Sequence, residues 1–385
     1  MRIFNLLLVV PLIVLSFIPK VYRNKVAVAA VFVIYTFILA IRYGQGSDYF
    51  AYELIFNQCD SLEAVFGGKI DVHSELLFQL ICVLFNPIGF KRFVVLVSIF
   101  QMSMLYRFCT KYSDNPMLSF AIAYPTLYST YFFSTMRQGL TMSIFLGLMY
   151  PLLKEKKYVP YYLLSAFCVG IHSSSAIYAL VPIVRCLKLN ELWGLDLLCL
   201  VAGTAITLVF LVLVHFETLS GTAKMYLTSD VSLVSLGVRI LKLLILYTLM
   251  RFSEDKQKVR ENETLLKIYA TSLIMYELLM WSPIISSRLA VFYEVVGIAL
   301  LPNLLDVKPL MKKAALAITA CLILIMTYKN ISAYIWQGEY TCSSTLDYPY
   351  VTVFNVDKIY EYRRNPYERY WFYDFIDNPY GGFDN

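Results

Sequence analysis

Long apolar stretches separated by short polar loops run through most of the chain. Each stretch is about 16 to 20 residues long, close to the length that crosses the hydrocarbon core as a helix. The predicted spans cover residues 3–18, 26–41, 92–108, 117–134, 137–153, 195–214, 233–252, 265–282, 286–303 and 312–330. This pattern predicts an all-α polytopic membrane protein with the spans arranged as a helical bundle.

Two further apolar segments depart from the pattern. Residues 75–89 are short and end at Asn86 and Pro87, which predicts an interfacial or re-entrant helix rather than a full crossing. Residues 158–187 are too long for one span, and the polar run at 170–175 interrupts them. We therefore expect two half-helices that meet at this run, for a total of about 12 crossings, within a range of roughly 10 to 13.

Composition agrees with a membrane location. Hydrophobic residues make up 59% of the 385 residues and charged residues only 16%, which is far from the composition of a soluble domain of this length. The formal net charge of +6 is concentrated in short loops, so it indicates orientation rather than nucleic-acid binding. We expect the lipid bilayer, and no nucleic acid, as a partner.

Positive charge in the loops gives a test of the topology, because Lys and Arg favour the cytoplasmic side. Six loops carry clusters of basic residues, which we predict to be cytoplasmic: Lys20, Arg23 and Lys25; Arg107 and Lys111; Lys154, Lys156 and Lys157; Arg185 and Lys188; Lys256, Lys258 and Arg260; and Lys308, Lys312 and Lys313. All six share one side only if the 75–89 helix does not cross and the 158–187 segment crosses twice. Both termini then lie outside.

This orientation brings scattered polar residues to the outer face. They are the segment 42–52 with Arg42, Asp48, Tyr49 and Tyr52, then Glu75, Arg137, Gln138, His172, the 215–232 loop with Lys224 and Tyr226, and Arg288. An arginine at the end of a span can line a polar pocket or extend its side chain toward water. His172 at a helix break can accept a proton near neutral pH or serve as a satisfied polar residue of the bundle.

Several kinds of chemistry are missing from the sequence. It has no Walker loop, no dinucleotide-binding glycine turn, no His-Glu-x-x-His and no Cys-x-x-Cys, so soluble-nucleotide and zinc enzymes are not expected. The chain has three histidines, His73, His172 and His215, and we predict neither a metal site nor a cofactor.

The order of the outer motifs resembles the EpsG family of Wzy-type polysaccharide polymerases, over about residues 26 to 350. The motifs are Arg-x-Gly-x-Gly-Ser-Asp-Tyr-x-x-Tyr at 42–52, Glu75, Met-Arg-Gln-Gly at 136–139, Gly-Ile-His-Ser-Ser-Ser-Ala at 170–176, Ser-Arg-Leu-Ala-Val-Phe-Tyr at 287–293 and Tyr-Pro-Tyr at 348–350. Gly139 and Leu140 depart from the family, which more often has an Ala-rich run after Arg-Gln.

The resemblance implies a GT-C-like glycosyltransferase of the bacterial inner membrane with its active site facing the periplasm. Such an enzyme transfers a growing glycan from undecaprenyl diphosphate onto the next lipid-linked repeat unit, as in O-antigen and lipopolysaccharide synthesis. The implied partners are the undecaprenyl-diphosphate-linked oligosaccharide and a chain-length regulator protein.

The residues suggest a division of roles for that reaction. Arginine can stabilise a leaving diphosphate without a metal, and we predict this role for Arg137 and Arg288, with Arg42 as a third. Asp48 is the first candidate for the base and His172 the second. Glu75 either orients a sugar or caps the 75–89 helix; we also expect Tyr49, Tyr52, Gln138 and Tyr293 to contact substrate.

The last segment, 331–385, is rich in aromatic and charged residues. We separate it from the polymerase domain at 1–330 as an extracytoplasmic tail, which stacks on sugar rings or lies on the headgroups. Three alternatives to a polymerase stay open: a flippase or transporter of lipid-linked oligosaccharide, an O-antigen ligase, and a non-enzymatic membrane scaffold. A transporter predicts an internal repeat, and none is evident in the sequence.

Overall fold

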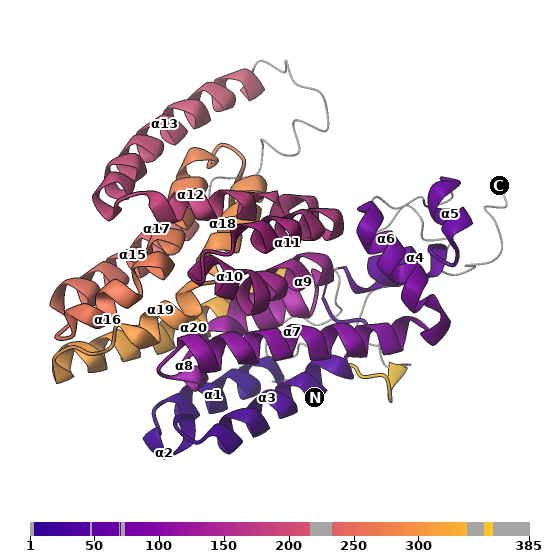
Figure 1. Cartoon of the computed structure of the whole chain (residues 1–385), viewed down its shortest axis with the longest axis horizontal. Helices are drawn as coiled ribbons and strands as arrows, with labels where there is room; N and C mark the ends of the chain where they lie inside the picture. Colours follow the sequence, from indigo (N-terminus) through magenta and orange to yellow (C-terminus); the bar gives the residue numbers. More distant parts are fainter. Residues whose placement is uncertain are drawn as a thin grey trace.

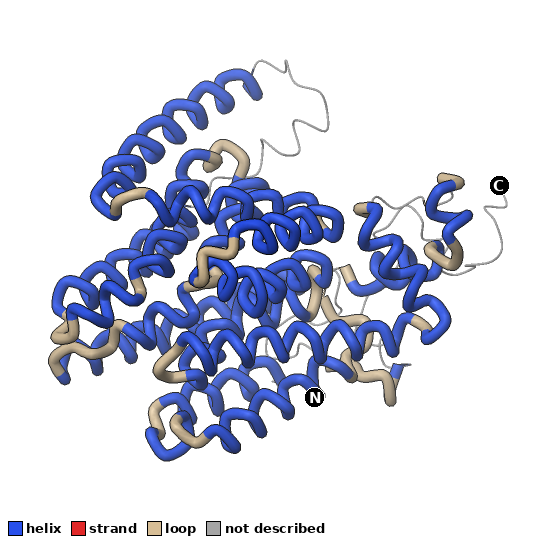
Figure 2. The backbone as a smooth tube through the Cα atoms, viewed as in Figure 1, coloured by secondary structure: helices blue, strands red, loops and turns tan. Residues whose placement is uncertain are grey.

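The computed structural model describes residues 4–46, 48–68, 70, 74–215, 233–336 and 350–356, and these residues are almost entirely helical (Figure 1 and Figure 2). Within these ranges there is no strand, only an isolated antiparallel bridge between Arg42 and Thr352. The all-α prediction is confirmed for this part of the chain.

Residues 4–154 form the first group of helices. Their bounds are α1 (Phe4–Ser16), α2 (Pro19–Tyr22), α3 (Lys25–Ala40), α4 (Tyr49–Gln58), α5 (Leu62–Phe66), α6 (Leu76–Phe85), the 3-10 helix η1 (Asn86–Ile88), α7 (Phe90–Tyr112), α8 (Pro116–Ala123), the π-helix η2 (Tyr124–Phe132), α9 (Met136–Ile144), the π-helix η3 (Phe145–Met149) and α10 (Tyr150–Lys154).

The second half completes the bundle. Its helices are α11 (Tyr158–Ile171), the 3-10 helix η4 (Ser173–Leu180), α12 (Val181–Cys186), α13 (Leu189–His215), α15 (Leu233–Phe252), α16 (Lys256–Glu261), α17 (Glu263–Leu278), α18 (Pro283–Glu294), α19 (Gly297–Asn303) and α20 (Pro309–Trp336). Helices α4 and α5 in the first outer loop, and α16, were not predicted from the sequence.

Few helices in the described residues are long and apolar enough to cross a membrane on their own. Two satisfy both conditions, Phe90–Tyr112 and Pro309–Asn330, and the pair Ile285–Glu294 and Gly297–Asn303, bent by 45°, makes a third. Six more apolar helices have 10–17 residues. The architecture is that of a helical membrane protein, while about 12 crossings stays a prediction.

Irregular turns explain why several predicted spans appear as short helices. The predicted span 117–134 consists of α8 followed directly by the π-helix η2, and Pro125 at the start of η2 has no N–H to donate. The carbonyl of Pro125 instead accepts hydrogen bonds from the Ser129 hydroxyl at 2.7 Å and the Thr130 hydroxyl at 3.2 Å. π-Helical turns are often found at functional sites, and η2 ends just before Arg137.

The segment 158–187 breaks where the sequence indicates. His172 has an extended backbone between α11 and η4, and the Tyr161 hydroxyl donates to the Tyr178 carbonyl at 2.7 Å across the two halves. The predicted pair of half-helices is therefore present as a hairpin with His172 at its tip.

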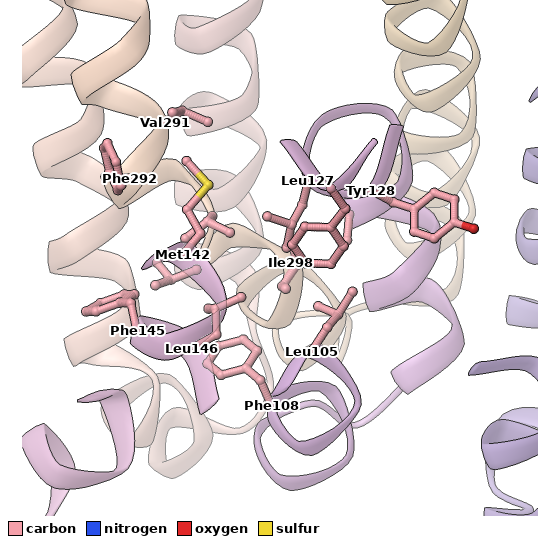
Figure 3. Packing of buried hydrophobic residues seen from close by; sticks show 14 of the residues in the cluster. Leu105, Phe108, Leu127, Tyr128, Met142, Phe145, Leu146, Val291, Phe292 and Ile298 are labelled. Atoms are coloured by element: carbon pink, nitrogen blue, oxygen red, sulfur yellow. The ribbon is translucent and has the colours of Figure 1, made fainter. Parts of the chain in front are cut away.

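Apolar side chains from six elements meet at the centre of the molecule. Figure 3 shows this packing, with Leu105 and Phe108 of α7, Leu127 and Tyr128 of η2, Met142 of α9, Phe145 and Leu146 of η3, Val291 and Phe292 of α18, and Ile298 of α19. All ten are buried. This core holds α9 and α18 in place, and both carry predicted site residues.

The basic loops gather at one end of the bundle. Lys111, Lys154 and Lys258, from three different loops, line one polar pocket, and the Glu254 N–H donates to the Asp306 carbonyl at 3.0 Å beside a fourth loop. Figure 1 shows α2 and α16 at this end, and α4, α5 and α6 at the opposite end. The shared end agrees with the predicted topology, and its placement in the cytoplasm stays a prediction.

A short stretch from the C-terminal part of the chain lies on the first outer loop. The Tyr43 N–H donates to the Val351 carbonyl at 2.9 Å, and the Tyr350 hydroxyl donates to the Ile38 carbonyl. The predictions for Lys224, Tyr226, Tyr348 and the tail after residue 356 lie outside the described residues.

Candidate functional site

The carboxylate of Glu75 lies at the meeting point of segments that are far apart in the sequence. Glu75 directly precedes α6, Arg137 lies in the first turn of α9, and His172 follows α11. Arg137 Nη1 is 2.5 Å from Oε2 of Glu75, and His172 Nδ1 is 3.6 Å from Oε1. We call these three residues, with Tyr52 and Asp48 beside them, the Glu75 centre.

Glu75 caps α6 by its position and charge only, and not by a hydrogen bond. It occupies the position before α6, but its side chain makes no hydrogen bond to that helix; its Oε1 accepts instead from the Ser173 N–H of η4 at 2.7 Å. Burial raises the pKa of the Glu75 carboxyl, but the Ser173 N–H and the Arg137 guanidinium offset this and leave the pKa below its usual value. Glu75 is therefore ionised at neutral pH.

His172 is neutral at neutral pH. Burial lowers its pKa to about 4; the charge of Glu75 opposes this shift, whereas the charges of Arg137 and Arg288 add to it. Neither ring nitrogen has a hydrogen-bond partner among the described residues. A neutral imidazole has one acceptor nitrogen, and beside a carboxylate it can accept a proton from a hydroxyl group and be stabilised as it becomes charged.

The guanidinium of Arg137 lies between a carboxylate and two aromatic rings. It sits 5.5 Å from the ring centre of Tyr52 and 5.6 Å from that of Phe78, within the range of cation–π attraction. Burial, with the charge of Asp48, raises the pKa of Tyr52 to about 12 although Arg137 opposes the shift. Tyr52 therefore keeps its proton, and Arg137 is fixed in orientation by its neighbours.

Asp48 reaches the centre because the first outer loop docks on the residues before α9. Its N–H donates to the Ser134 hydroxyl at 3.4 Å. A Cβ on Gly46 would lie 2.4 Å from the Cβ of Ser134, and Gly46 has φ +81°, so this close approach requires glycine. The charge of Asp48 acts on Tyr52 and Arg137, which places the carboxylate next to the centre.

Arg288 and Gln138 lie at the edge of the centre. The Gln138 amide, which is buried, donates to the Arg288 carbonyl at 3.2 Å and so ties α9 to α18. The Arg288 side chain is exposed, and its charge acts on His172 and on Tyr131 of η2. Arg288 is thus accessible to a ligand, whereas Gln138 joins two helices.

Arg42 lies in a different environment from the one the sequence indicates. Its side chain is fully buried, and Nη1 donates to the Leu39 carbonyl at 2.5 Å and the Ser98 hydroxyl at 2.8 Å. Its Nε donates to the Phe133 carbonyl at 3.3 Å. These contacts join α3, α7 and η2, so in this conformation the guanidinium is a structural link rather than part of an open pocket.

All three predicted tyrosines are buried, and two of them pack away from the Arg137–Glu75 ion pair. Tyr49 packs edge-on against Tyr43, Phe50 and Phe90, and the Tyr293 hydroxyl donates to the Ile177 carbonyl at 2.6 Å. Tyr49 therefore positions α4, and Tyr293 joins α18 to η4 beneath His172.

The sequence did not predict two neighbours of the centre, the Phe78 ring against Arg137 and the Ser173 N–H that donates to Glu75. Ser173 follows His172 in the polar run at 170–175, so a helix start with open N–H groups was detectable there. Phe78 lies one turn after Glu75 in an apolar helix, where nothing in the sequence distinguishes it from lipid-facing neighbours. In the described ranges, no three His, Cys, Asp or Glu side chains form a metal-binding group.

Comparison with known proteins identifies the family. The sequence model of the EpsG family matches residues 25–344, a range that includes every member of the Glu75 centre. Neither the curated proteins nor the solved structures contain a match. Because the match covers most of the chain, this protein belongs to the EpsG family.

Proposed function

We propose that this protein is a polysaccharide polymerase, which transfers a growing glycan from undecaprenyl diphosphate to a lipid-linked repeat unit. The EpsG family is associated with polysaccharide-biosynthesis polymerases, and the apolar helical bundle fits a lipid-linked substrate. We place the reaction at the outer face of the bacterial inner membrane, where the predicted topology puts the Glu75 centre.

The convergence of Glu75, Arg137 and His172 is the observation that carries the proposal. These residues come from three separate segments, yet one carboxylate contacts both partners. A partly buried ion pair of this kind is a costly way to stabilise a bundle, and it lies beside a histidine whose buried ring nitrogens have no hydrogen-bond partner among the described residues. Such perturbed groups cluster at functional sites.

The reaction needs one bond formed and one broken. The acceptor hydroxyl oxygen attacks the anomeric carbon of the donor glycan, and the bond from that carbon to the diphosphate oxygen breaks. We assign the hydroxyl proton to His172, where Glu75 stabilises the resulting imidazolium. Arg137 and the accessible Arg288 stabilise the negative charge that develops on the departing diphosphate.

Asp48 is the other candidate for the base. Its charge acts on Tyr52 and Arg137, whereas the ring nitrogens of His172 have no hydrogen-bond partner among the described residues. We therefore assign Asp48 to orienting Tyr52 and Arg137. The roles separate experimentally, because loss of a base removes turnover and loss of an orienting group reduces it.

A polysaccharide profile in cells tests the proposal. A deletion strain would be complemented with wild type, Glu75→Gln, Arg137→Ala or His172→Ala, and its surface glycan separated on a gel. Arg92→Ala is the matched control, because Arg92 is an exposed arginine whose Nη1 donates to the Ile88 carbonyl near the same end of the bundle.

A polymerase defect has a distinct pattern. We expect the three centre variants to lose the ladder and keep a single capped repeat unit, and Arg92→Ala to keep the ladder. Loss of all surface glycan, including the single unit, would favour a flippase or a ligase. A full ladder from all three variants at normal protein levels would overturn the proposal.

A further inference from the structure

Two cysteines meet at the end of the bundle opposite the basic loops, where α4 and α6 lie (Figure 1). Cys59 directly follows α4, and Cys82 lies within α6. Their thiols share a hydrogen bond, and both side chains are 0% exposed. In the part of the chain that the structure describes, no other two cysteines share a hydrogen bond. Cys59 and Cys82, which are free thiols in the structure, therefore form a pair.

The packing of α4 against α6 holds these two thiols together. The ring centres of Tyr52 and Phe78 are 6.0 Å apart, and the Asn86 side-chain amide donates to the Phe56 carbonyl at 3.2 Å. Cys82 lies one turn from Phe78 and one turn from Asn86 on α6, between these two contacts. The thiol contact is therefore part of a helix pair that is fixed on both sides of it.

Each cysteine of the pair lies two helical turns from a member of the Glu75 centre. Cys59 lies two turns after Tyr52 on α4, and Cys82 lies two turns after Glu75 on α6, about 10 Å along each axis. The charge of Arg137 also acts on Cys82. A covalent link at the pair would fix the spacing of the two helices that carry Tyr52 and Glu75.

Two neighbouring thiols can bind a metal ion or form a disulfide. A structural zinc site needs four ligands, but in the described ranges no three His, Cys, Asp or Glu side chains form a metal-binding group. The predicted topology places α4 and α6 at the outer face, and disulfides form and persist in an oxidising compartment such as the bacterial periplasm. The surroundings of the pair therefore favour a disulfide over a metal ion.

We propose that Cys59 and Cys82 form a disulfide that joins α4 to α6 beside the Glu75 centre. The bond forms by exchange with an external disulfide of a protein or a small molecule: one cysteine thiolate attacks it and releases a thiol, and the second cysteine displaces the other. The pair loses two protons and two electrons, and the external disulfide is reduced to two thiols. Because both thiols are buried once α4 and α6 pack, the exchange takes place before this packing. The inference goes beyond the proposed function, since it depends on where the pair lies and not on the reaction.

Peptide mapping of the full-length protein tests the disulfide. The protein would be extracted from membranes without reductant, blocked with N-ethylmaleimide in denaturant and digested with trypsin. Cleavage after Lys69 separates Cys59 and Cys82 into peptides 43–69 and 70–91. We expect mass spectrometry to find the two peptides linked, with the summed mass less two hydrogen atoms, and reduction to release them.

Cys109 is the matched control in the same sample, because it is also 0% exposed but lies on α7 near the basic loops. We expect Cys109 to carry the maleimide, which shows that the reagent reaches buried thiols. In Cys82→Ser, peptide 43–69 should carry it as well. Maleimide on both Cys59 and Cys82 of the unreduced wild type would overturn the inference. A link from Cys59 to Cys342, which lies outside the described residues, would also overturn it.

Discussion

The Glu75 centre and the ion pairs of Glu294 use the same kinds of residue in different surroundings. At the Glu75 centre one ionised carboxylate faces one arginine and a neutral histidine, with Asp48 nearby. At the end of α18, Glu294 faces Lys242 and Arg239 of α15 next to an apolar pocket. The first arrangement suits proton transfer, and the second joins two helices of the bundle.

This difference separates a place for chemistry from a place that holds the bundle together. The Glu75 centre lies beside α4 and α6, at the end opposite α16, and the ion pairs of Glu294 lie between α15 and α18 (Figure 1). Variants at the two places should therefore fail in different ways.

The largest effect is expected for Arg137→Ala. This change removes the charge that we assign to the departing diphosphate and leaves Glu75 without its ion-pair partner, so we expect polymer synthesis to fall about 100-fold or more. The measurement is incorporation of repeat units by purified enzyme, with kcat and KM determined separately. We expect kcat to fall, and a normal kcat with a raised KM would place Arg137 in lipid binding instead.

His172→Ala should give the next largest loss of polymer synthesis, because it removes the proposed base. The same residue also makes the stability of the wild type depend on pH. The pKa of His172 is near 6.5 in the unfolded chain and about 4 in the folded protein. The unfolded state therefore binds more protons between these values, and stability rises with pH across about 4 to 6.5. Above that range the contribution is complete.

The same shift predicts the acid limb of activity. A base with a pKa of about 4 keeps its free form down to mildly acidic pH, so wild-type activity should not fall as pH drops from 7 to 5.5. Asp48→Asn should lower the rate but keep this profile. An acid limb near pH 6.5 that persists in a His172 variant would exclude His172 as the group that titrates.

Lys242→Gln tests the other side of the comparison. The change removes the nearest cation of Glu294, so we expect the free energy of unfolding to fall by about 1 to 3 kcal/mol with kcat changed less than about twofold. Thermal unfolding in detergent measures the first quantity and incorporation of repeat units the second. A large fall in kcat in a stably folded variant would mean that this ion pair acts on the chemistry and that the two places are not functionally distinct.

The smallest effect is expected for Tyr293→Phe. The change removes one hydrogen bond, to the Ile177 carbonyl, so we expect a loss of about 1 kcal/mol in the free energy of unfolding. Thermal unfolding in detergent measures it, and polymer synthesis should be unchanged. An inactive but stable Tyr293→Phe protein would restore the original prediction that Tyr293 contacts substrate.

Much of the fold followed from the sequence because it depends on local patterns. Apolar length predicted where most helices lie, and the run at 170–175 predicted the break at His172. The π-helical turns did not follow, because η2 depends on tertiary contacts such as the hydrogen bond from the Asn330 amide of α20 to the Pro125 carbonyl. Helices α4 and α5 lie in an outer loop whose apolar residues are too few to signal a span.

The candidate site followed from the sequence only in part. Asp48, Tyr52, Glu75, Arg137 and His172 are brought together, as the shared outer face suggested. Arg42 has the same chemistry as Arg137, but its Nε and Nη1 donate to carbonyls of the bundle while Nη2 has no hydrogen-bond partner among the described residues. A sequence does not show which arginine finds such partners. Arg239 and Lys242 lie within the predicted span 233–252. Charged side chains within a span are energetically costly unless they are paired, so these two residues already indicated a polar contact inside the bundle.

Polymerisation by the purified protein tests the central claim most directly. Wild type, Glu75→Gln, Arg137→Ala and Arg92→Ala would be reconstituted with lipid-linked repeat units isolated from a strain that lacks the polymerase, and product length would be measured. We predict long products from wild type and Arg92→Ala, and unextended substrate from the two centre variants. Products of normal length from folded Glu75→Gln and Arg137→Ala proteins would contradict the assignment of the Glu75 centre as the site of glycosidic bond formation.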